Sequence, residues 1–363
     1  MTVNEVLSRI ESNGFEAYIV GGYVRDSLLG IESTDVDICT NARVKDLLDI
    51  FIDTNATSNE YGSVKINSND YRIDITTYRR DVKYNGNRRK VEIEYVDNLI
   101  DDVNRRDFTM NTLCMNKEGF IVDLFDGRKD IEDHIIRCVG KEEDRLEEDP
   151  LRMLRAVRFA CTLNFRIEEK LYKALKKKRK LIEKLSLERV KEELTKILVG
   201  SNPIAGLKLL RELGFLKYMG ISFDEDKIVP VSDICGMYSQ LDFTKEYPFS
   251  KEEKENIKKI KSILKYGIIN NNIIFDDGLY ISLVAGDILG YDREKIILME
   301  KELVIRRYKD LAVNSDDICR ILEIKPNKKL NEVFEDLKTK VLNLELENTY
   351  EALSKYLFNM RKK

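Results

Sequence analysis

Asp35 and Asp37 are the residues whose type and spacing point most directly to chemistry. In a β-strand, residues i and i+2 face the same side, and their backbones lie about 6.5–7 Å apart, so the two carboxylates can converge on a hard cation. Mg²⁺ prefers one or two carboxylates completed by substrate phosphates. By itself such a pair is equally typical of a solvated strand end or turn. Asp74 adds a possible third carboxylate, unless it pairs with Arg72 or Arg79.

A glycine-rich turn lies a dozen residues upstream, in the segment GGYVRDSLLG (21–30). Gly21 and Gly22 allow backbone amides to approach a phosphate closely, and the start of the following helix adds favourable partial charge. Arg25 supplies a fixed cation. A phosphate cradle beside a metal pair predicts nucleotidyl transfer, in which one metal lowers the pKa of an attacking 3′-hydroxyl and the other stabilises the departing pyrophosphate.

The elements that position these residues are short strands and helices in the first third of the chain. Thr2 and Glu5 form a capping box for a helix over 2–13 that Gly14 stops, and a second helix is predicted over 24–29. Strands are predicted at 17–20, 36–39, 63–67, 71–78, 91–96 and 120–125.

The pattern of the sequence changes from strand-like to helical after about Val139. From Asp149 onward the apolar residues recur every 3.6 residues, which predicts mostly helix, and Ser250 and Glu253 are expected to cap a later helix. Loops are expected near 200–203 and 221–250. The sequence therefore predicts an α+β protein with a small mixed-sheet head followed by an elongated helical remainder.

Composition sets further limits on the 363-residue chain. Its length suggests two to four structural units, and 43% apolar residues suffice for a substantial core. A net charge of −3 argues against a generally basic nucleic-acid binder, although phosphate contacts need only a local basic face. One run of basic residues could form such a face, although such a run is also typical of a solvated helix surface. The run comprises Lys170, Lys173, Lys176, Lys177, Lys178, Arg179, Lys180 and Lys184.

Six cysteines without a CxxC pair, and His134 as the only histidine, exclude a His/Cys zinc site and an HD-type phosphohydrolase centre. The first residues show no secretory signal pattern, and no apolar run reaches the roughly 18 residues that a membrane span needs. We therefore expect a reducing, cytoplasmic location and no membrane partner.

Several ordered motifs resemble those of the class II tRNA nucleotidyltransferases and bacterial poly(A) polymerases, most closely the bacterial CCA-adding enzymes. They are GGYVRDSLLG (21–30), DVD (35–37), RRDFTMN (105–111), DLFDGRKDIEDHIIRCVG (123–140), EDPLRMLRAVRFA (148–160) and LSLERVKEELTKIL (185–198). The resemblance implies a polymerase-beta-like nucleotidyltransferase head at 1–137. It further implies an elongated all-helical neck, body and tail at 138–200, 201–295 and 296–363, with a tRNA-binding tail.

The resemblance also assigns roles to individual residues. It implies that Asp35 and Asp37 form the catalytic metal pair for Mg²⁺, and that Gly22 and Arg25 bind the incoming triphosphate beside Gly21. The further nucleotide-binding positions that it implies are Arg106, Asp107 in a part of its motif linked to ribose recognition, Asp149 and Arg152 for base selection, and Arg155 and Arg158.

The chemistry of base selection by Asp149 and Arg152 can be stated from the residues. Asp149 can accept a hydrogen bond from the exocyclic amine of cytosine or adenine, while Arg152 can donate to ring acceptors. Positions i and i+3 are neighbours on a helix. Alternatively, Asp149 only caps the helix that Pro150 starts. Because each step of three residues drifts about 60° round the helix, Arg155 is better placed for contact than Arg158.

The resemblance predicts addition and repair of the 3′-terminal CCA of tRNA from CTP and ATP, without a template and without an obligate protein partner. A full-length segment at 80–95 favours terminal A addition, despite Lys90 where a proline is common. A net acidic chain disfavours poly(A) synthesis. An A-adding enzyme and a poly(A) polymerase stay open as alternatives, and a non-catalytic RNA-binding protein is a further one.

Overall fold

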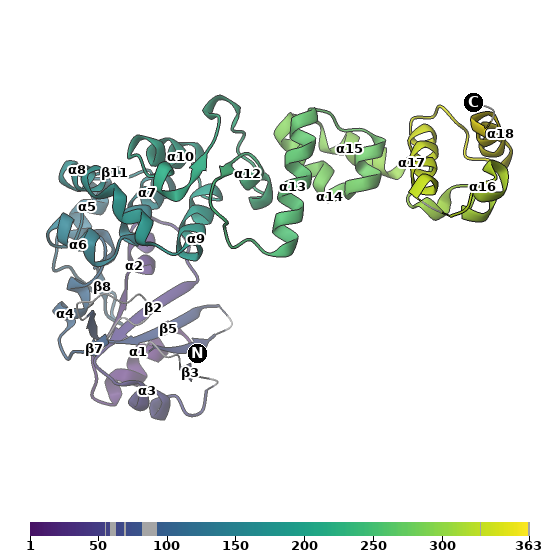
Figure 1. Cartoon of the computed structure of the whole chain (residues 1–363). Coiled ribbons are helices and arrows are strands. Elements are labelled where there is room, and N and C mark those ends of the chain that lie inside the picture. The colour runs from purple at the N-terminus through teal and green to yellow at the C-terminus, as the bar shows by residue number, and fades with distance from the viewer. Residues whose placement is uncertain (55, 59–62, 69, 82–92, 327, 362–363) are drawn as a thin grey trace. The chain divides into compact units, whose positions relative to one another are not determined.

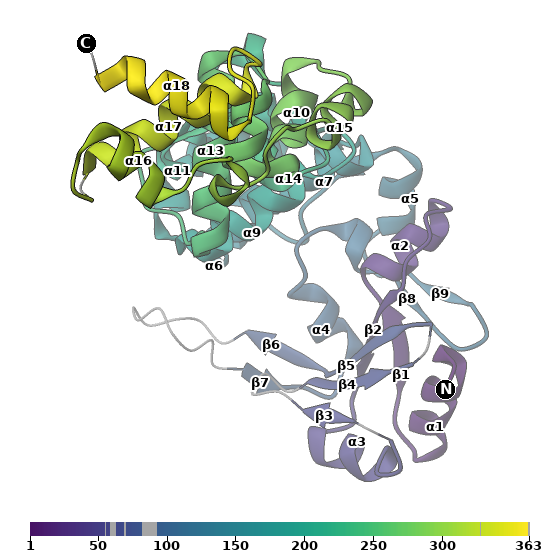
Figure 2. The same ribbon diagram turned by 90° about the vertical axis from the view of Figure 1, so that its right-hand side faces the viewer.

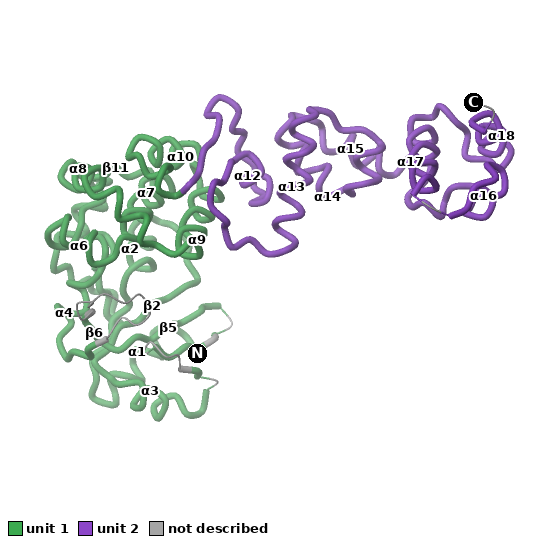
Figure 3. The backbone as a smooth tube through the Cα atoms, viewed as in Figure 1, with its two compact units in different colours: residues 1–219 green, residues 220–363 purple. Residues whose placement is uncertain are grey.

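The computed structural model describes residues 1–54, 56–58, 63–68, 70–81, 93–326 and 328–361. The chain divides into two compact units, residues 1–219 and 220–363 (Figures 1 and 3). The first unit contains a small mixed sheet together with helices, and the second is almost entirely helical. The predicted α+β class is confirmed.

Within the described residues, the main sheet of the first unit has the strand order β3-β4-β5-β2-β1-β8-β9. β2 runs parallel to β5 and antiparallel to β1, so the sheet is mixed. Its strands are β1 Ala17–Val20, β2 Asp35–Thr40, β3 Thr57–Ser58, β4 Ser63–Asn67, β5 Arg72–Thr77, β8 Cys114–Met115 and β9 Ile121–Val122, and a separate ribbon pairs β6 Arg79–Asp81 with β7 Ile93–Tyr95.

Helices α1 (Val3–Ser12) and α3 (Val44–Ile50) lie on one side of this sheet (Figures 1 and 2). The capping box of Thr2 and Glu5 forms as predicted, and its helix buries Val6, Leu7 and Ile10. Buried and exposed residues alternate along the first half of β2, with Val36 and Ile38 buried. The other face of the sheet is therefore left for the polar residues between them.

Most predicted strands are present with shifted ends, and two details differ from the sequence analysis. The helix predicted over 24–29 is α2, Gly22–Leu28, and begins two residues early because Gly21, at φ +79°, makes the turn alone. The strand predicted at 120–125 contracts to Ile121–Val122, since Asp123 turns its carboxylate to the amides of Gly127 and Arg128 and so ends the strand.

The rest of the first unit is mostly helical. It comprises α4 Leu99–Asn104, η1 Thr109–Asn111, α5 Gly127–Glu132, β10 Ile135–Ile136, α6 Glu142–Glu148, α7 Leu151–Leu163, β11 Arg166–Ile167, α8 Glu169–Lys178, η2 Arg179–Lys184, α9 Leu187–Leu198, α10 Pro203–Glu212 and α11 Leu216–Met219. α7 packs on both α9 and α10, and it buries Met153, Leu154 and Val157. These contacts hold α7 at the centre of the unit's helical part.

The second unit corrects the prediction of a loop over 221–250, because α12 (Ile234–Ser239) forms inside it. Asp233 caps this helix, and Tyr238 packs with Phe243, Tyr247 and Phe249 in an aromatic cluster. Six residues are too few to give a clear helical period. The capping of the next helix by Ser250 and Glu253 is confirmed.

The remaining elements of the second unit form two apolar clusters, one centred on Ile260 and Ile296 and the other on Ile318 and Leu337. The elements are β12 Ile221–Ser222, η3 Glu225–Lys227, β13 Asp242–Phe243, α13 Lys251–Tyr266, α14 Asn271–Leu289, α15 Arg293–Lys301, η4 Tyr308–Asp310, α16 Ser315–Leu322, α17 Lys328–Leu342 and α18 Tyr350–Arg361. Among the described residues, no helix is both long and apolar enough to cross a membrane.

Candidate active site

Three carboxylates share the open face of the sheet. Asp35 and Asp37 are exposed on either side of buried Val36 on β2, and Asp74 stands directly opposite Asp37 on the parallel strand β5. Asp35 forms an ion pair with Arg72, with 2.7 Å between Oδ1 and Nε. Asp74 therefore does not take Arg72 as its partner, and the Nζ of Lys65 lies 3.5 Å from its Oδ2.

This face concentrates negative charge around Asp37. Partial burial raises the pKa of the Asp37 carboxyl, and the neighbouring carboxylates of Asp74 and Asp35 raise it further, while Arg106 opposes the change. The Oδ1 atom of Asp74 is buried and has no hydrogen-bond partner in the described part of the chain. A cation would relieve both conditions, so the carboxylate set fits a divalent metal ion.

The three carboxylates alone do not form a complete metal-binding site. In the described residues, no group of three or more His, Cys, Asp or Glu side chains could hold a metal ion alone. That is the arrangement expected where substrate phosphates and water complete the coordination of Mg²⁺.

The glycine turn lies next to this face. Val20 pairs with Asp37 in the β1–β2 register, and the chain then turns at Gly21. A Cβ atom on Gly21 would lie 3.8 Å from Oδ2 of Asp37 and 3.4 Å from Nη1 of Arg106. The position therefore needs glycine for its positive φ, and it faces both the Asp37 carboxylate and the Arg106 guanidinium.

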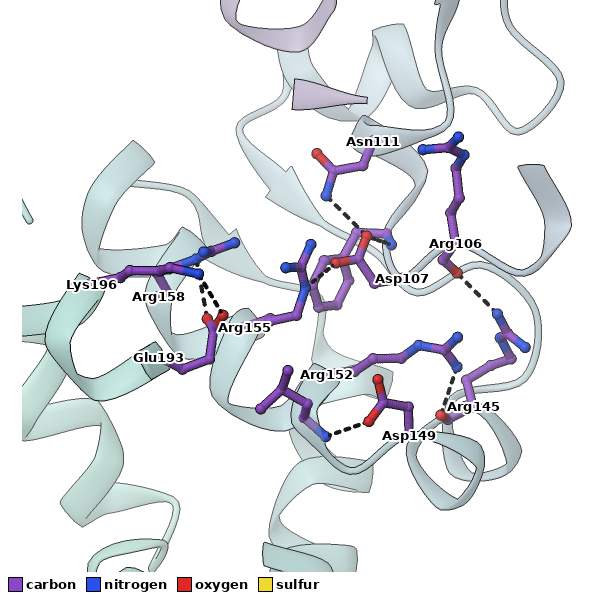
Figure 4. A network of polar contacts seen from close by, with 12 residues as sticks. Arg106, Asp107, Asn111, Arg145, Asp149, Arg152, Arg155, Arg158, Glu193 and Lys196 are labelled. Atoms are coloured by element: carbon purple, nitrogen blue, oxygen red, sulfur yellow. Dashed lines mark hydrogen bonds and ion pairs between the residues drawn. The ribbon is translucent and has the colours of Figure 1, made fainter. Parts of the chain in front are cut away.

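A chain of hydrogen bonds joins the head to helix α7. Arg25 is buried and donates from Nη1 to the side-chain oxygen of Asn111 at 2.7 Å. Asn111 in turn donates from Nδ2 to Asp107 at 3.0 Å, and Arg155 on α7 donates from Nε to the other oxygen of Asp107 at 2.6 Å (Figure 4). Arg25 also binds Asp26. The predicted positions 25, 107 and 155 therefore belong to one network.

Asp107 and Arg106 each have a defined electrostatic setting. Burial alone would raise the pKa of Asp107, but Arg155 and the hydrogen bonds from Asn111 and the Phe108 amide outweigh it, so the pKa falls. Arg106 donates from Nη2 to Asp102 at 3.1 Å. Arg106 is therefore held charged with Nη1 toward the glycine turn.

Asp149 and Arg152 lie at the start of α7 (Figure 4). Asp149 accepts a hydrogen bond from the Leu151 amide at 3.1 Å, so the capping alternative is partly correct. Its two oxygens also lie 3.2 Å from Nη2 of Arg189, on α9. Within the described residues, no hydrogen bond or ion pair joins Asp149 to the Arg152 side chain.

Arg152 is buried, and its guanidinium group forms several hydrogen bonds within the protein. It donates to the backbone carbonyl oxygens of Arg105 at 2.7 Å and Arg145 at 2.8 Å, and it lies 3.4 Å from Glu148. These contacts tie the start of α7 to the segment that carries Arg106 and Asp107. A guanidinium has five N–H donors, so Arg152 retains donors beyond these three contacts.

Arg155 and Arg158 diverge as the helical drift predicts. Arg155 points to Asp107, whereas Arg158 lies 3.4 Å from Glu193 of α9 (Figure 4). Lys196 shares Glu193 at 3.3 Å. Arg155 is therefore tied to the carboxylate of the head and Arg158 to the neighbouring helix.

Sequence reasoning missed several residues that organise the site. Asn111 bridges Arg25 and Asp107, Arg189 holds Asp149, and Asp102 holds Arg106. Asn111 and Arg189 lie inside motifs already quoted, and Asp102 is a buried acid four residues before Arg106. The i, i+4 spacing of Asp102 and Arg106 was the one local signal available.

The basic run at 170–184 is partly neutralised by acidic residues of α6. Lys177 and Lys178 both form ion pairs with Glu143, and Lys178 also pairs with Glu147. Lys173 pairs with Glu169 on its own helix. Lys170, Lys180 and Lys184 are exposed. Any contact with RNA phosphates falls mainly to these exposed positions.

Comparisons with known proteins agree along the whole chain. Residues 17–137 match the poly A polymerase head domain family. Residues 164–221 match the probable RNA and SrmB-binding site of polymerase A, and residues 234–357 match a family described as tRNA nucleotidyltransferase domain 2, putative.

Among curated relatives, the CCA-adding enzyme of Ligilactobacillus salivarius is 33% identical, over 96% of this chain and 93% of its own. The CCA-adding enzyme of Enterococcus faecalis is 32% identical, over 99% and 95%.

Solved structures agree with these relatives. The Bacillus stearothermophilus CCA-adding enzyme in complex with CTP has a TM-score of 0.86 at 27% identity, and the match covers 100% of this chain and 98% of that one. The Thermotoga maritima CCA-adding enzyme complexed with tRNA_CCA shares the fold, with a TM-score of 0.68 at 19% identity over 98% and 94% of the two chains. With near-complete coverage at more than 30% identity, the chain belongs to the CCA-adding enzyme family of tRNA nucleotidyltransferases.

Proposed function

We propose that this protein adds and repairs the 3′-terminal CCA of tRNA, using CTP and ATP and selecting each base without a template. The observation that carries the proposal is the meeting of three features at one turn. Gly21 lies against Asp37 and Arg106, and Asn111 links the same turn through Arg25 to Asp107 and α7. The carboxylate assigned to the metal and the turn assigned to the phosphates are then connected, through Asp107 and Arg155, to the helix whose start is assigned to base selection.

Mg²⁺ is the metal ion that we assign to Asp35 and Asp37, with Asp74 as a third carboxylate. When bound, it would neutralise phosphate charge and favour ionisation of the attacking 3′-hydroxyl. The protein's own part is to position the reactants. Gly21 and Gly22 leave room for the triphosphate, and Arg106 supplies a positive charge at the same turn.

Base selection is assigned to Asp149 and Arg152. The Asp149 carboxylate, oriented by Arg189, accepts a hydrogen bond from the exocyclic amine of cytosine or adenine. Guanine and uracil present a keto oxygen at the corresponding place, so two acceptors would face each other and binding would be lost. Arg152 uses donors beyond those bound to the backbone. It also fixes the start of α7 against the Arg106–Asp107 segment.

Four features of the proposal stay predictions from the sequence. The segment 80–95, whose length favours terminal A addition, falls largely in 82–92, outside the described residues. The division into head, neck, body and tail at 137, 200 and 295 likewise stays a prediction, as do a tRNA-binding tail and a cytoplasmic location. An A-adding enzyme and a poly(A) polymerase remain the alternatives to test.

A product-length assay tests the proposal and separates these alternatives. tRNA transcripts ending at the discriminator base, at C or at CC are incubated with Mg²⁺ and with CTP, ATP or both. Growth by three nucleotides from the discriminator base supports CCA addition. Growth only from the CC end would instead indicate A addition, and long ladders with ATP would indicate poly(A) synthesis.

The Asp35→Ala variant distinguishes an enzyme from a protein that only binds RNA. Since Asp35 is exposed, its loss is expected to leave the fold intact while it abolishes incorporation. tRNA binding by the variant is expected to stay near that of the unmodified protein. Incorporation that survives in Asp35→Ala would overturn the catalytic assignment.

A further inference from the structure

Three arginine side chains surround the ring of Phe159, near the middle of α7. The guanidinium carbons of Arg158, Arg25 and Arg155 lie 4.4, 5.0 and 5.4 Å from the ring centroid. Phe159 is buried, and its ring meets that of Phe108 edge-on, with 5.8 Å between centroids. The ring therefore contacts the buried ring of Phe108 and lies close to three cations.

The three arginines come from two helices, and hydrogen bonds through Asn111 and Asp107 link two of them, Arg25 and Arg155. Arg25 belongs to α2 and binds Asn111 and Asp26, whereas Arg155 and Arg158 belong to α7 and bind Asp107 and Glu193. The Phe159 ring is the feature that all three share. It therefore joins the glycine turn of the head to the basic side of α7.

Each arginine of the cluster has one carboxylate partner, and the three guanidinium groups still lie close enough to repel one another. Burial lowers the pKa of Arg158, and the nearby charges of Arg155 and Arg25 lower it further, against the pull of Glu193. The buried Nε atom of Arg158 forms an ion pair with Oε2 of Glu193, but at 3.4 Å the contact is too long for a good charge-assisted hydrogen bond. The mutual repulsion of the three guanidinium groups is therefore only partly offset, and a bound anion would reduce it.

An aromatic ring can hold the three arginines together and still leave them able to bind an anion, which another acidic side chain could not do as well. The ring face carries partial negative charge and attracts a guanidinium, yet it leaves the net charge of the cation unchanged. A carboxylate in the same place would add a fourth negative charge to the cluster and compete with a phosphate. The ring can therefore assemble like charges and still leave them available to an anionic ligand.

We propose that Phe159 is a positioning residue whose ring gathers Arg25, Arg155 and Arg158 into a receptor for the triphosphate of the incoming nucleotide. This inference rests on the proposed function, because the anion that it assigns is the triphosphate of CTP or ATP. Phe159 touches no reacting atom itself. Its contribution is to hold three cations from two parts of the molecule in one arrangement.

The test compares Phe159→Leu with Phe108→Leu, which makes the same chemical change in the adjoining ring. Calorimetric titration with CTP and with CMP, both in the presence of Mg²⁺, separates triphosphate recognition from base and sugar recognition, and thermal unfolding reports stability. Loss of the ring at 159 is expected to weaken CTP binding about tenfold and to leave CMP binding within about twofold. Phe108→Leu is expected to lower stability and to leave the ratio of CTP to CMP affinity unchanged.

Phe159→Tyr keeps the ring face and is expected to retain the CTP affinity that Phe159→Leu loses. Phe159→Met replaces the leucine variant if that variant fails to fold. If the variants at 159 keep the CTP to CMP ratio of Phe108→Leu, the positioning role is overturned and Phe159 is only a core residue. If the unmodified protein neither binds CTP nor incorporates it, the proposed function itself fails, independently of the comparison between variants.

Discussion

Asp74 lies directly opposite Asp37 across the parallel strands β2 and β5, and one of its oxygens is buried without a hydrogen-bond partner among the described residues. At this position the Asp74 carboxylate could bind a cation together with Asp35 and Asp37. The alternative is a structural acid that only balances Lys65, at 3.5 Å. The two roles predict different kinetics.

We expect Asp74→Asn to lower kcat for CTP incorporation about 10- to 100-fold, the range typical of groups that support a metal site. The Mg²⁺ concentration needed for half-maximal rate should rise as well, because one negative charge is lost. Steady-state assays over a Mg²⁺ titration measure both. Glu94→Gln, at an exposed ion pair on β7, serves as control. A variant at 74 with the unmodified protein's Mg²⁺ dependence would show a structural role.

Arg189 is expected to set the accuracy of base selection. It holds both oxygens of Asp149 at 3.2 Å, and without it that carboxylate is free to turn away from the exocyclic amine. Arg189→Gln should reduce the preference for CTP over UTP about tenfold, equivalent to one charge-assisted hydrogen bond. The ratio of kcat/KM values for the two nucleotides measures it. Lys184→Gln, an exposed change just before α9, should leave the ratio unaltered, and an unchanged ratio in Arg189→Gln would contradict the role.

The sequence could predict features that depend on neighbours in the chain. The capping boxes at Thr2 and Ser250 and the alternation along β2 are local, so α1, α13 and the shared face of Asp35 and Asp37 followed directly. The helix α12 was missed because it is short and is held by aromatic packing with residues outside it.

The hydrogen bonds that connect the site residues could not be predicted, because the two partners of each bond lie far apart in the sequence. Asn111 lies 86 residues from Arg25, and Arg189 lies 40 residues from Asp149. No periodicity or spacing rule links such positions, and only the packing of α7 against the head and against α9 brings them together. The motif residues could therefore be named in advance, whereas their partners could not.

The basic run gives a prediction for RNA binding. Lys170, Lys180 and Lys184 are exposed, whereas Lys178 is held by Glu143 and Glu147. If the exposed lysines meet tRNA phosphates, replacing all three with glutamine should reduce the slope of log K against log salt by about 2–3. Filter binding from low to moderate salt measures the slope. Lys178→Gln should change it little, and an unaltered slope in the triple variant would leave the run as a solvated helix surface.

Asp102 is expected to dominate the acid stability of the head. It is fully buried and accepts hydrogen bonds from Arg105 at 2.9 Å, Arg106 at 3.1 Å and the amide of Arg79 at 3.2 Å. Burial alone would raise the pKa of Asp102, but Arg106 and Arg105 outweigh it, so the pKa is lowered in the folded protein.

The sign of the pH effect follows from that lowered pKa. The stabilisation from Asp102 is fully present above the unfolded value of about 3.9, and it is lost as the pH falls through the lower folded value. The free energy of unfolding should therefore be insensitive to this carboxyl between about pH 5 and 8 and should fall below about pH 4. Asp102→Asn should cost about 3 kcal/mol at pH 7, because the largely buried Arg106 side chain loses its counter-charge.

Urea unfolding at stepped pH measures both effects. The gap in unfolding free energy between the unmodified protein and Asp102→Asn should be widest at neutral pH and should narrow toward pH 3, because the carboxyl binds a proton in the unfolded state at a higher pH than in the folded state. Asp53→Asn is the control, since Asp53 pairs with Arg9 at the surface, where such pairs contribute little. A gap that stays constant down to pH 3 would mean that the charge on Asp102 is not what holds Arg105 and Arg106 in place.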